Sequence, residues 1–292
     1  MRHATTLLEG LHFGEGPRWH DGKLWFSDFY DHAVMSVKPG GPAEKVVEVP
    51  GQPSGLGWLP DGRLLVVSMT DRKLMRLEGK NLVQHADLSG VATFHCNDMV
   101  VDSVGRAYVG NFGFDLEAYM ATHGIEAALG EPGAPTATLA RVDPDGSVHT
   151  AATGMRFPNG SVVTPDGRTL IVAETLGLRL TAFDIAPDGT LSGRRVWAST
   201  GSVAPDGICL DAAGAIWVSN PLGTECVRVA EGGDVLDRLT TSQPSFAVAL
   251  GGPGRKTLFL MTAPGSAVDV VGTARAGKVE AVEVEVGGAG LP

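Results

Sequence analysis

The sequence predicts an all-β fold, a six-bladed β-propeller, and three observations support this prediction. A hairpin motif with a conspicuous turn glycine recurs six times along the 292 residues. Successive turn glycines are separated by 40 to 62 residues, and a four-stranded propeller blade needs about 40–50 residues. Both ends of the sequence are also rich in strand-forming residues, as closure of a ring of blades requires.

Each copy of the motif has a lead residue, a short apolar run, the turn glycine and a second apolar run. In the fourth copy Asn159 leads into Ser161–Thr164, and Pro165-Asp166-Gly167-Arg168 separates this run from Thr169–Ala173. Turn residues between two β-rich runs indicate a hairpin. The six turn glycines are Gly22, Gly62, Gly105, Gly167, Gly214 and Gly254. The lead residue precedes its glycine by eight positions in five copies and by seven in the first. An ordinary β-sandwich, the alternative fold, would require no such fixed offset.

Further strand-like runs lie between the copies and complete the expected blades. They are Ala33–Lys38, Lys73–Glu78, Leu139–Asp143, Arg179–Ile185 and Cys226–Ala230. Thr5–Leu8 and Lys278–Val286 are expected to pair in one sheet and close the last blade. The alternation in Val282–Val286 suits an outer, half-solvated strand. Residues 1–292 are therefore expected to form a single six-bladed domain.

The interval between the third and fourth turn glycines is unusually long because it contains an insertion at about 113–137 in the third blade. Leu116–Leu129 has helical character, with apolar residues that include Leu116, Tyr119, Met120 and Ile125. One interpretation is a simple surface excursion. The other is a lid or specificity loop over the face on which the lead residues open, since binding elements collect on loops.

Composition and charge narrow the classes of partner. Lys and Arg number 23 and Asp and Glu number 33, which gives a net charge of −10 and argues against nucleic acid or an anionic membrane as partner. The N-terminal residues lack the apolar run of a signal peptide, and no segment approaches the roughly 18 apolar residues of a membrane helix. Cys96, Cys209 and Cys226 form neither a CxxC pair nor an even disulfide set. These features predict a soluble cytoplasmic protein, with a monomer as the default for a closed ring.

The lead residues are candidates for a metal site because a propeller brings equivalent positions of successive blades into a ring around its axis. They are Glu15, Ser54, Asn97, Asn159, Asp206 and Phe246. Four of them carry a carboxylate or carboxamide oxygen, the hard ligands that Ca²⁺, Mg²⁺ and Mn²⁺ prefer. Taken singly, Asn159-Gly160 and Asp206-Gly207 are common hairpin-turn dipeptides, and Glu15 is compatible with a solvated loop. Their shared phase in the repeat favours the metal site.

At these residues the chain resembles the SMP-30/gluconolactonase/LRE-like family (senescence marker protein 30, or regucalcin). The resemblance extends from about Leu8 to Val286 and is carried by four short motifs. These are Gly14-Glu15-Gly16-Pro17-Arg18-Trp19, Asn97-Asp98, Phe157-Pro158-Asn159-Gly160 and Pro205-Asp206-Gly207. It implies a six-bladed propeller with one divalent metal ion in the central tunnel, and hydrolysis of a lactone.

The resemblance also implies roles for individual residues. Glu15, Asn159 and Asp206 match the metal ligands of the family, and Asn97 matches a substrate-contacting asparagine near the metal. Sugar-lactonase members often have an arginine two residues before that asparagine, whereas this chain has His95 followed by Cys96. An acidic residue further along the same blade could correspond to Asp115, inside the insertion. These departures leave metal binding intact and weaken the case for a polyhydroxylated sugar lactone, with His95 either a substrate contact or a rim histidine.

The leading hypothesis is a metal-dependent lactonase that opens a sugar lactone or another small cyclic ester. The ion would be Ca²⁺ as first choice, with Mn²⁺, Mg²⁺, Zn²⁺ and Fe²⁺ as alternatives. Asp206 would activate water, Glu15 and Asn159 would fix the ion, and Asn97 would orient the substrate.

Three rival hypotheses start from the same propeller. One is hydrolysis of an aryl ester or phosphotriester at the same site, and another is a metal-binding propeller without catalysis. A strictosidine-synthase-like condensation leaves the Glu/Asn/Asp set unexplained. The sequence contains no HExxH, no G-x-S-x-G elbow and no GxxxxGK[ST] loop, so zincin, serine-hydrolase and phosphate-loop sites are not indicated.

Overall fold

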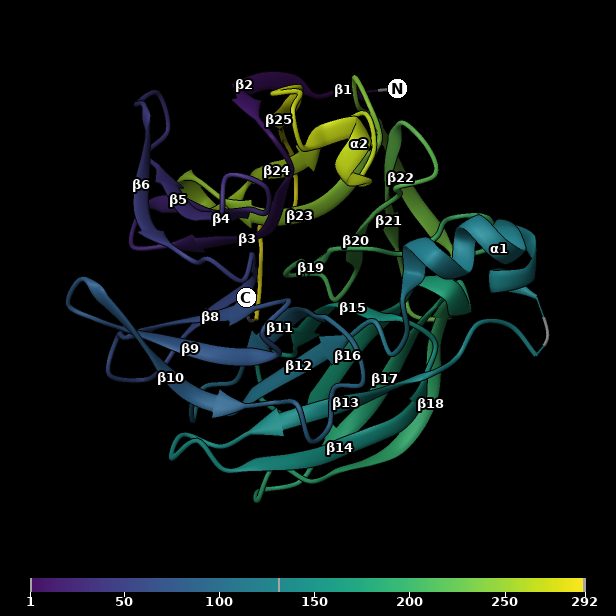
Figure 1. Cartoon of the computed structure of the whole chain (residues 1–292). Helices are drawn as coiled ribbons and strands as arrows, with labels where there is room; N and C mark the ends of the chain where they lie inside the picture. The colour runs from purple at the N-terminus through teal and green to yellow at the C-terminus, as the bar shows by residue number, and fades with distance from the viewer. Residues whose placement is uncertain (1, 131, 291–292) are drawn as a thin grey trace.

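The computed structural model describes residues 2–130 and 132–290. Within these ranges the strands form six sheets that radiate around a central axis like the blades of a propeller (Figure 1). Apart from the N-terminal strands β1 and β2, the strands of a blade follow one another in the sequence and pair as antiparallel neighbours, as the hairpin repeat predicts. The predicted six-bladed β-propeller is confirmed.

The blades are numbered in chain order, and each is given from its innermost strand outward. Blade 1 contains β3 (Gly14–His20), β4 (Lys23–Asp28), β5 (Ala33–Val37) and β6 (Ala43–Glu48). Blade 2 contains β7 (Pro53–Trp58), β8 (Leu64–Ser68), β9 (Lys73–Glu78) and β10 (Asn81–Asp87). Blade 3 contains β11 (Cys96–Val101), β12 (Ala107–Asn111), β13 (Ala137–Val142) and β14 (Val148–Met155).

The remaining blades include strands from both ends of the described chain. Blade 4 contains β15 (Pro158–Val163), β16 (Thr169–Glu174), β17 (Arg179–Ile185) and β18 (Leu191–Ser199). Blade 5 contains β19 (Ile208–Leu210), β20 (Ile216–Ser219), β21 (Glu225–Val229), β22 (Val235–Thr240) and β1 (Arg2–His3). Blade 6 contains β23 (Ser245–Gly251), β24 (Thr257–Thr262), β25 (Gly277–Glu283) and β2 (Thr5–Leu11). The helical segments are α1 (Leu116–Leu129), α2 (Val268–Val271), η1 (Thr175–Gly177) and η2 (Pro253–Arg255).

The six turn glycines explain why the repeat was visible in the sequence. Every one of them has a positive φ, from 62° at Gly254 to 93° at Gly105. Only glycine adopts this backbone conformation without steric cost, so each hairpin requires glycine at that position. The other predicted runs also form strands, and β9, β17 and the helix α1 have the predicted bounds.

Ring closure occurs as predicted, with one correction. β2 pairs with β25, with Thr5 opposite Ala281 and Thr6 opposite Glu280, so strands from the two ends of the chain complete blade 6. However, β25 ends at Glu283 and is covered by β2, which is the outermost strand of the blade. The prediction that Val282–Val286 forms an outer strand is therefore wrong, because the N-terminal segment takes that position.

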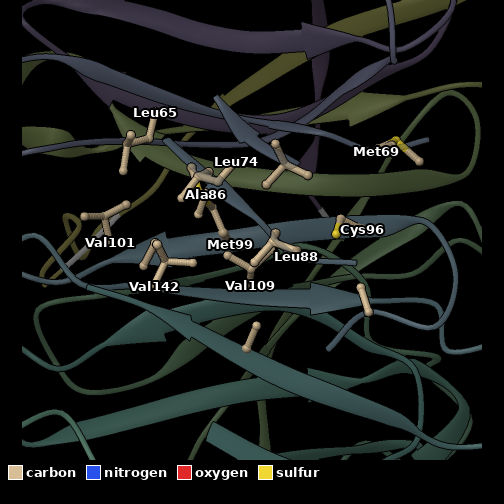
Figure 2. Packing of buried hydrophobic residues seen from close by; sticks show 14 of the residues in the cluster. Leu65, Met69, Leu74, Ala86, Leu88, Cys96, Met99, Val101, Val109 and Val142 are labelled. Atoms are coloured by element: carbon tan, nitrogen blue, oxygen red, sulfur yellow. The ribbon is translucent and has the colours of Figure 1, made fainter. Parts of the chain in front are cut away.

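The core consists of apolar layers between neighbouring blades. In the layer between blades 2 and 3, Leu65 and Leu74 of one sheet face Met99 and Val109 of the next, and all four are at most 1% exposed (Figure 2). Burying a side chain of this size contributes about 1.5–3 kcal/mol. These layers fix the angle between blades and hence the positions of the inner strands.

The inner strands form a closed ring in which β3, β7, β11, β15, β19 and β23 each contact the next, and β23 returns to β3. Five lead residues are the second residue of their inner strand, and Asp206 stands two residues before β19, so the six lead residues gather at one end of the axis. The insertion joins β12 to β13 and emerges at this same end. Neither α-helix in the described ranges is long and apolar enough to cross a bilayer.

Candidate metal centre

Four of the lead residues bring oxygen-bearing side chains to the end of the axis. Glu15 is the second residue of β3, Asn97 the second of β11, and Asn159 the second of β15, while Asp206 stands two residues before β19. All four are buried, with 5–7% of their surface exposed. The predicted site residues are therefore at equivalent places in blades 1, 3, 4 and 5.

The glycines that follow these residues show how closely the inner strands approach. A Cβ atom added to Gly160 would lie 2.6 Å from the backbone nitrogen of Ile208, and one added to Gly207 would lie 2.5 Å from Cα of Ala247. The backbone N–H of Gly160 donates to the carbonyl of Asp206 at 3.2 Å. Such close approach leaves no room for a side chain.

The backbone conformation shows whether Asn159-Gly160 and Asp206-Gly207 are hairpin turns, as their composition allows. A two-residue type I′ hairpin turn requires positive φ at both central residues. Neither Gly160 nor Gly207 has a positive φ, and Gly160 lies inside β15. The dipeptides Asn159-Gly160 and Asp206-Gly207 are therefore not hairpin turns, and their glycines allow the inner strands to meet at the axis.

Within residues 2–130 and 132–290, neither of the two carboxylates at the axis, Glu15 and Asp206, forms an ion pair with a basic side chain. Burial raises the pKa of Glu15 to about 8, and the negative charge of Asp98 adds to this shift. Burial also raises the pKa of Asp206 well above its usual value, with further contributions from Glu15 and Asp98, while a hydrogen bond from Asn159 opposes the shift. Buried carboxylates that repel one another favour either a proton or a cation between them.

Arg18, whose charge acts on Glu15, is already engaged by other groups. Arg18 is 4% exposed, and its Nη2 atom donates to Oδ1 of Asp98 at 2.7 Å. Its Nε atom donates to the carbonyl of Leu56 at 3.0 Å, and Nη1 donates to the carbonyl of Pro17 at 2.9 Å. The ion pair of Arg18 is thus made with Asp98 rather than with Glu15 or Asp206.

The donor set fits a hard divalent ion. The carboxylates of Glu15 and Asp206 and the amide of Asn159 carry oxygen atoms of the kind that Ca²⁺, Mg²⁺ and Mn²⁺ prefer, with the amide of Asn97 at the equivalent place in blade 3. In residues 2–130 and 132–290 no group of three or more His, Cys, Asp or Glu side chains is placed to hold a metal ion. Glu15, Asn159 and Asp206 do not make such a group, because only two of these three residues are acidic.

In blades 2 and 6 the lead residues are Ser54 and Phe246, which carry no carboxylate or amide. The hydroxyl of Ser27 donates to the carbonyl of Ser54 at 2.6 Å, which fixes the start of β7 against blade 1. Phe246 packs edge-on against Phe13 with 4.8 Å between ring centroids. At the lead position, blade 6 therefore has an aromatic side chain that packs in the core instead of an oxygen-bearing one.

His95 lies beside the site, in the segment that enters β11. It is half-buried, and its ring stacks on Phe94 with 4.2 Å between centroids and 25° between planes. Its backbone carbonyl accepts the N–H of Phe112 at 2.9 Å. Burial lowers the pKa of His95, so the imidazole is neutral near pH 7. It can exchange hydrogen bonds with a ligand but does not supply the fixed positive charge of an arginine.

Asp115 has a structural role in the insertion. Its Oδ1 atom accepts the backbone N–H of Ala118 at 2.9 Å, which makes it the N-cap of α1. An aspartate at this position satisfies a helix N–H group that would otherwise lack a partner. This hydrogen bond accounts for the acidic residue without a contact to substrate.

The insertion packs onto the segment that precedes Asn159. Phe157 and Ala128 lie in one buried apolar cluster, and Phe112, Phe114 and Tyr119 pack against it. The Nη2 atom of Arg156 donates to the carbonyls of Ala128 and Gly130, at 3.1 and 2.9 Å. The insertion thereby buttresses blade 4 next to the site.

Sequence reasoning assigned no role to two residues that contact the site. Asp98 was visible within the Asn97-Asp98 motif, but its pairing with Arg18 depends on two blades meeting at the axis. Thr175 hydrogen-bonds to the side chain of Asn159 at 3.2 Å from 16 positions away. No spacing rule links these positions, because the contact exists only after β15 and β16 pair.

Comparison with known proteins agrees with this architecture. Residues 13–264 match the model of the SMP-30/gluconolactonase/LRE-like region. The pentonolactonase XacC of Haloferax volcanii is 27% identical over 260 residues, which cover 86% of this chain and 82% of the relative. The 6-deoxy-6-sulfogluconolactonase of Pseudomonas putida is 24% identical over 290 residues, covering 96% and 94%.

A solved structure shows the same fold. The structure of regucalcin from Agrobacterium tumefaciens, described as a calcium-binding protein, superposes with a TM-score of 0.79 at 20% identity, and the match covers 100% of this chain and 97% of that one. At this level of identity the likeness establishes the fold. The family match covers most of the chain and includes the buried residues at the axis, from Glu15 to Asp206. The protein belongs to the SMP-30/gluconolactonase/LRE-like family.

Proposed function

We propose that the protein is a divalent-metal-dependent lactonase with its site at the end of the propeller axis. The observation that carries the proposal is the pair of buried, mutually interacting carboxylates of Glu15 and Asp206, neither of which forms an ion pair with a basic side chain of the described residues. Relatives that match more than four-fifths of the chain are named lactonases. The proposal treats the six blades as one domain with one site.

Glu15, Asn159 and Asp206 would hold the ion, and Asn97 would lie close to it. Ca²⁺ is the first choice for this oxygen-rich set, with Mn²⁺, Mg²⁺, Zn²⁺ and Fe²⁺ as alternatives. When bound, the ion supplies a positive charge that polarises the ester carbonyl and stabilises negative charge on its oxygen.

The residues of the chain would perform the remaining steps. Asp206 accepts a proton from the attacking water, whose oxygen bonds to the carbonyl carbon. The ring C–O bond then breaks, and the departing alkoxide takes the proton back from Asp206, so the product is a hydroxy acid and Asp206 is again ionised. Asn97 orients the substrate by donating a hydrogen bond from its side-chain amide.

We further propose that His95 contacts the substrate as a neutral hydrogen-bonding group. His95→Ala is expected to raise KM about 2–10-fold and to change kcat by less than about twofold, since a neutral hydrogen bond contributes about 0.5–1.5 kcal/mol. Steady-state kinetics on the best lactone would measure this split.

His149→Ala is the matched control for His95, because His149 lies on β14, away from the axis. It should leave both kinetic constants unchanged. An unchanged KM in His95→Ala would show that His95 is a rim residue without a role in binding.

The proposed setting is the cytoplasm, with a small-molecule lactone as the partner and a monomer as the active form. The three cysteines are free and buried, as in proteins from reducing compartments. The net charge of −10 disfavours nucleic acid and anionic lipid.

Acid release from a panel of esters tests the proposed activity. The panel contains sugar lactones, plain alkyl and aryl lactones, an aryl ester and a phosphotriester, with metal-supplemented protein and a pH indicator. At least one lactone is expected to be the best substrate. Turnover of the aryl ester or phosphotriester alone would assign the sister activity, and no turnover with metal bound would indicate a non-catalytic binder.

A further inference from the structure

Thr175 connects the two segments that carry two of the proposed ligands. It is the first residue of η1, directly after β16, and is half-buried at the same end of the axis as the site. Its Oγ1 atom donates to the carbonyl of Pro205 at 2.7 Å. The same oxygen accepts a hydrogen bond from Nδ2 of Asn159 at 3.2 Å. One hydroxyl therefore bridges Asn159 in blade 4 and the residue before Asp206 in blade 5.

The direction of these two hydrogen bonds follows from which of the groups carry a proton to donate. A threonine hydroxyl has one proton, and a backbone carbonyl can only accept. The proton of Thr175 is therefore committed to Pro205, and its oxygen can only accept from Asn159. Of the two ends of the Asn159 amide, only the NH₂ group can donate. The nitrogen must face Thr175, and the amide oxygen must face away from it.

This orientation matters because only the amide oxygen can bind a cation. In the described ranges no group donates a hydrogen bond to Oδ1 of Asn159, whereas Nδ2 is held by Thr175. The hydrogen bond between the Asn159 and Asp206 side chains acts on the same amide. If the amide were rotated by half a turn, two N–H donors would face the cation instead of a ligand oxygen.

The backbone around Thr175 is anchored independently of its side chain. Its N–H donates to the carbonyl of Phe157 at 3.1 Å, and the next N–H, of Leu176, donates to the carbonyl of Arg156 at 3.2 Å. Phe157 has a φ of 61°, a conformation that costs a non-glycine residue about 1–3 kcal/mol and needs such support. Changing the Thr175 side chain leaves these backbone bonds in place, so its hydroxyl can be tested separately from the fold.

We propose that Thr175 is a positioning residue whose hydroxyl sets the orientation of the Asn159 amide so that Oδ1 is presented to the metal ion. The inference rests on the proposed function, because it assumes that Asn159 is a metal ligand. Thr175 does not touch the ion or the substrate. It acts through Asn159 and by holding the Pro205-Asp206 segment beside it.

Calorimetric titration of the metal-free protein with Ca²⁺ alone tests this role without any substrate. Thr175→Val keeps the shape of the side chain and removes both hydroxyl hydrogen bonds, so the Kd for Ca²⁺ is expected to rise about 3–10-fold. Thr175→Ser keeps the hydroxyl and is expected to bind Ca²⁺ within about twofold of the unmodified protein.

A second threonine supplies the matched control. The hydroxyl of Thr164 also makes two hydrogen bonds, with Asp166 and Thr169, but at the far end of the same blade. Thr164→Val should leave the Kd unchanged. An unchanged Kd in Thr175→Val, or equal weakening in Thr175→Val, Thr175→Ser and Thr164→Val, would overturn the positioning role while leaving the metal site standing. If the unmodified protein bound none of Ca²⁺, Mn²⁺, Mg²⁺, Zn²⁺ and Fe²⁺, the metal site and the role of Thr175 would both be refuted.

Discussion

Asp206→Ala is expected to abolish lactone hydrolysis, with a loss in kcat of at least about 10³-fold, and to weaken binding of the divalent ion. Loss of a general base alone costs about 10²–10⁴-fold. In this site the same carboxylate is also proposed as a ligand, so its removal deletes two functions together. Steady-state kinetics and calorimetric metal titration of the purified variant would measure both effects.

Asp211→Asn is a suitable control for this substitution. Asp211 is also a buried aspartate of blade 5, but it pairs with Arg228 and caps the hairpin turn at the far end of the blade. Its replacement should lower the melting temperature and leave the kcat of the folded protein unchanged. An Asp206→Ala protein that retained both its metal and its activity would remove Asp206 from the mechanism.

The metal-free protein is expected to lose stability as the pH rises from about 5 to 8. The pKa of Glu15 is about 8 in the folded protein and 4.5 for the ordinary carboxyl group. Between these values the folded state holds a proton that the unfolded state releases, so the stability present below pH 4.5 is lost as the pH rises toward 8. The charge of Asp98 adds to the raised pKa of Glu15, whereas the backbone N–H of Gly16 and the charge of Arg18 oppose it, and the pKa of Asp206 is raised in the same direction.

Thermal unfolding can measure how the stability of the metal-free protein changes with pH and whether added metal reverses this change. Release of one full proton removes about 1.4 kcal/mol of stability per pH unit, and 1 kcal/mol shifts the melting temperature of a large domain by about 2–4 °C. Added Ca²⁺ should restore the melting temperature most strongly at pH 8, because the ion binds the ionised carboxylates. Glu15→Gln should flatten the pH dependence. A metal-free protein with the same melting temperature throughout this range, with or without Ca²⁺, would contradict the electrostatic description of the site.

The fold was predictable because its determinants are local and repeated. Each hairpin needs a glycine with positive φ, and Gly22, Gly62 and Gly105 show this requirement as clearly as Gly167 does. The period of these glycines then gives the number of blades. The short strand β1 was not predictable, since Arg2 and His3 are too few to form a pattern and pair with blade 5 only in the assembled fold.

The site was predictable only in outline. Glu15, Asn159 and Asp206 share one phase of the repeat, and a propeller places equal phases together. The Arg18–Asp98 ion pair and the Thr175 hydroxyl bridge were not predictable, because each depends on side-chain directions across blade boundaries. The sequence also suggested turns at Asn159-Gly160 and Asp206-Gly207. The structure shows glycines required by close backbone approach instead.

Chelation during lactone hydrolysis is the most direct measurement of whether a metal ion at Glu15, Asn159 and Asp206 opens the ring. Acid release from the best lactone would be followed in untreated protein, after EDTA treatment, and after single additions of Ca²⁺, Mn²⁺, Mg²⁺, Zn²⁺ and Fe²⁺. Hydrolysis is expected to stop with EDTA and to return with at least one ion, Ca²⁺ first. Hydrolysis that continued at full rate in protein shown to contain no metal would contradict the proposed mechanism.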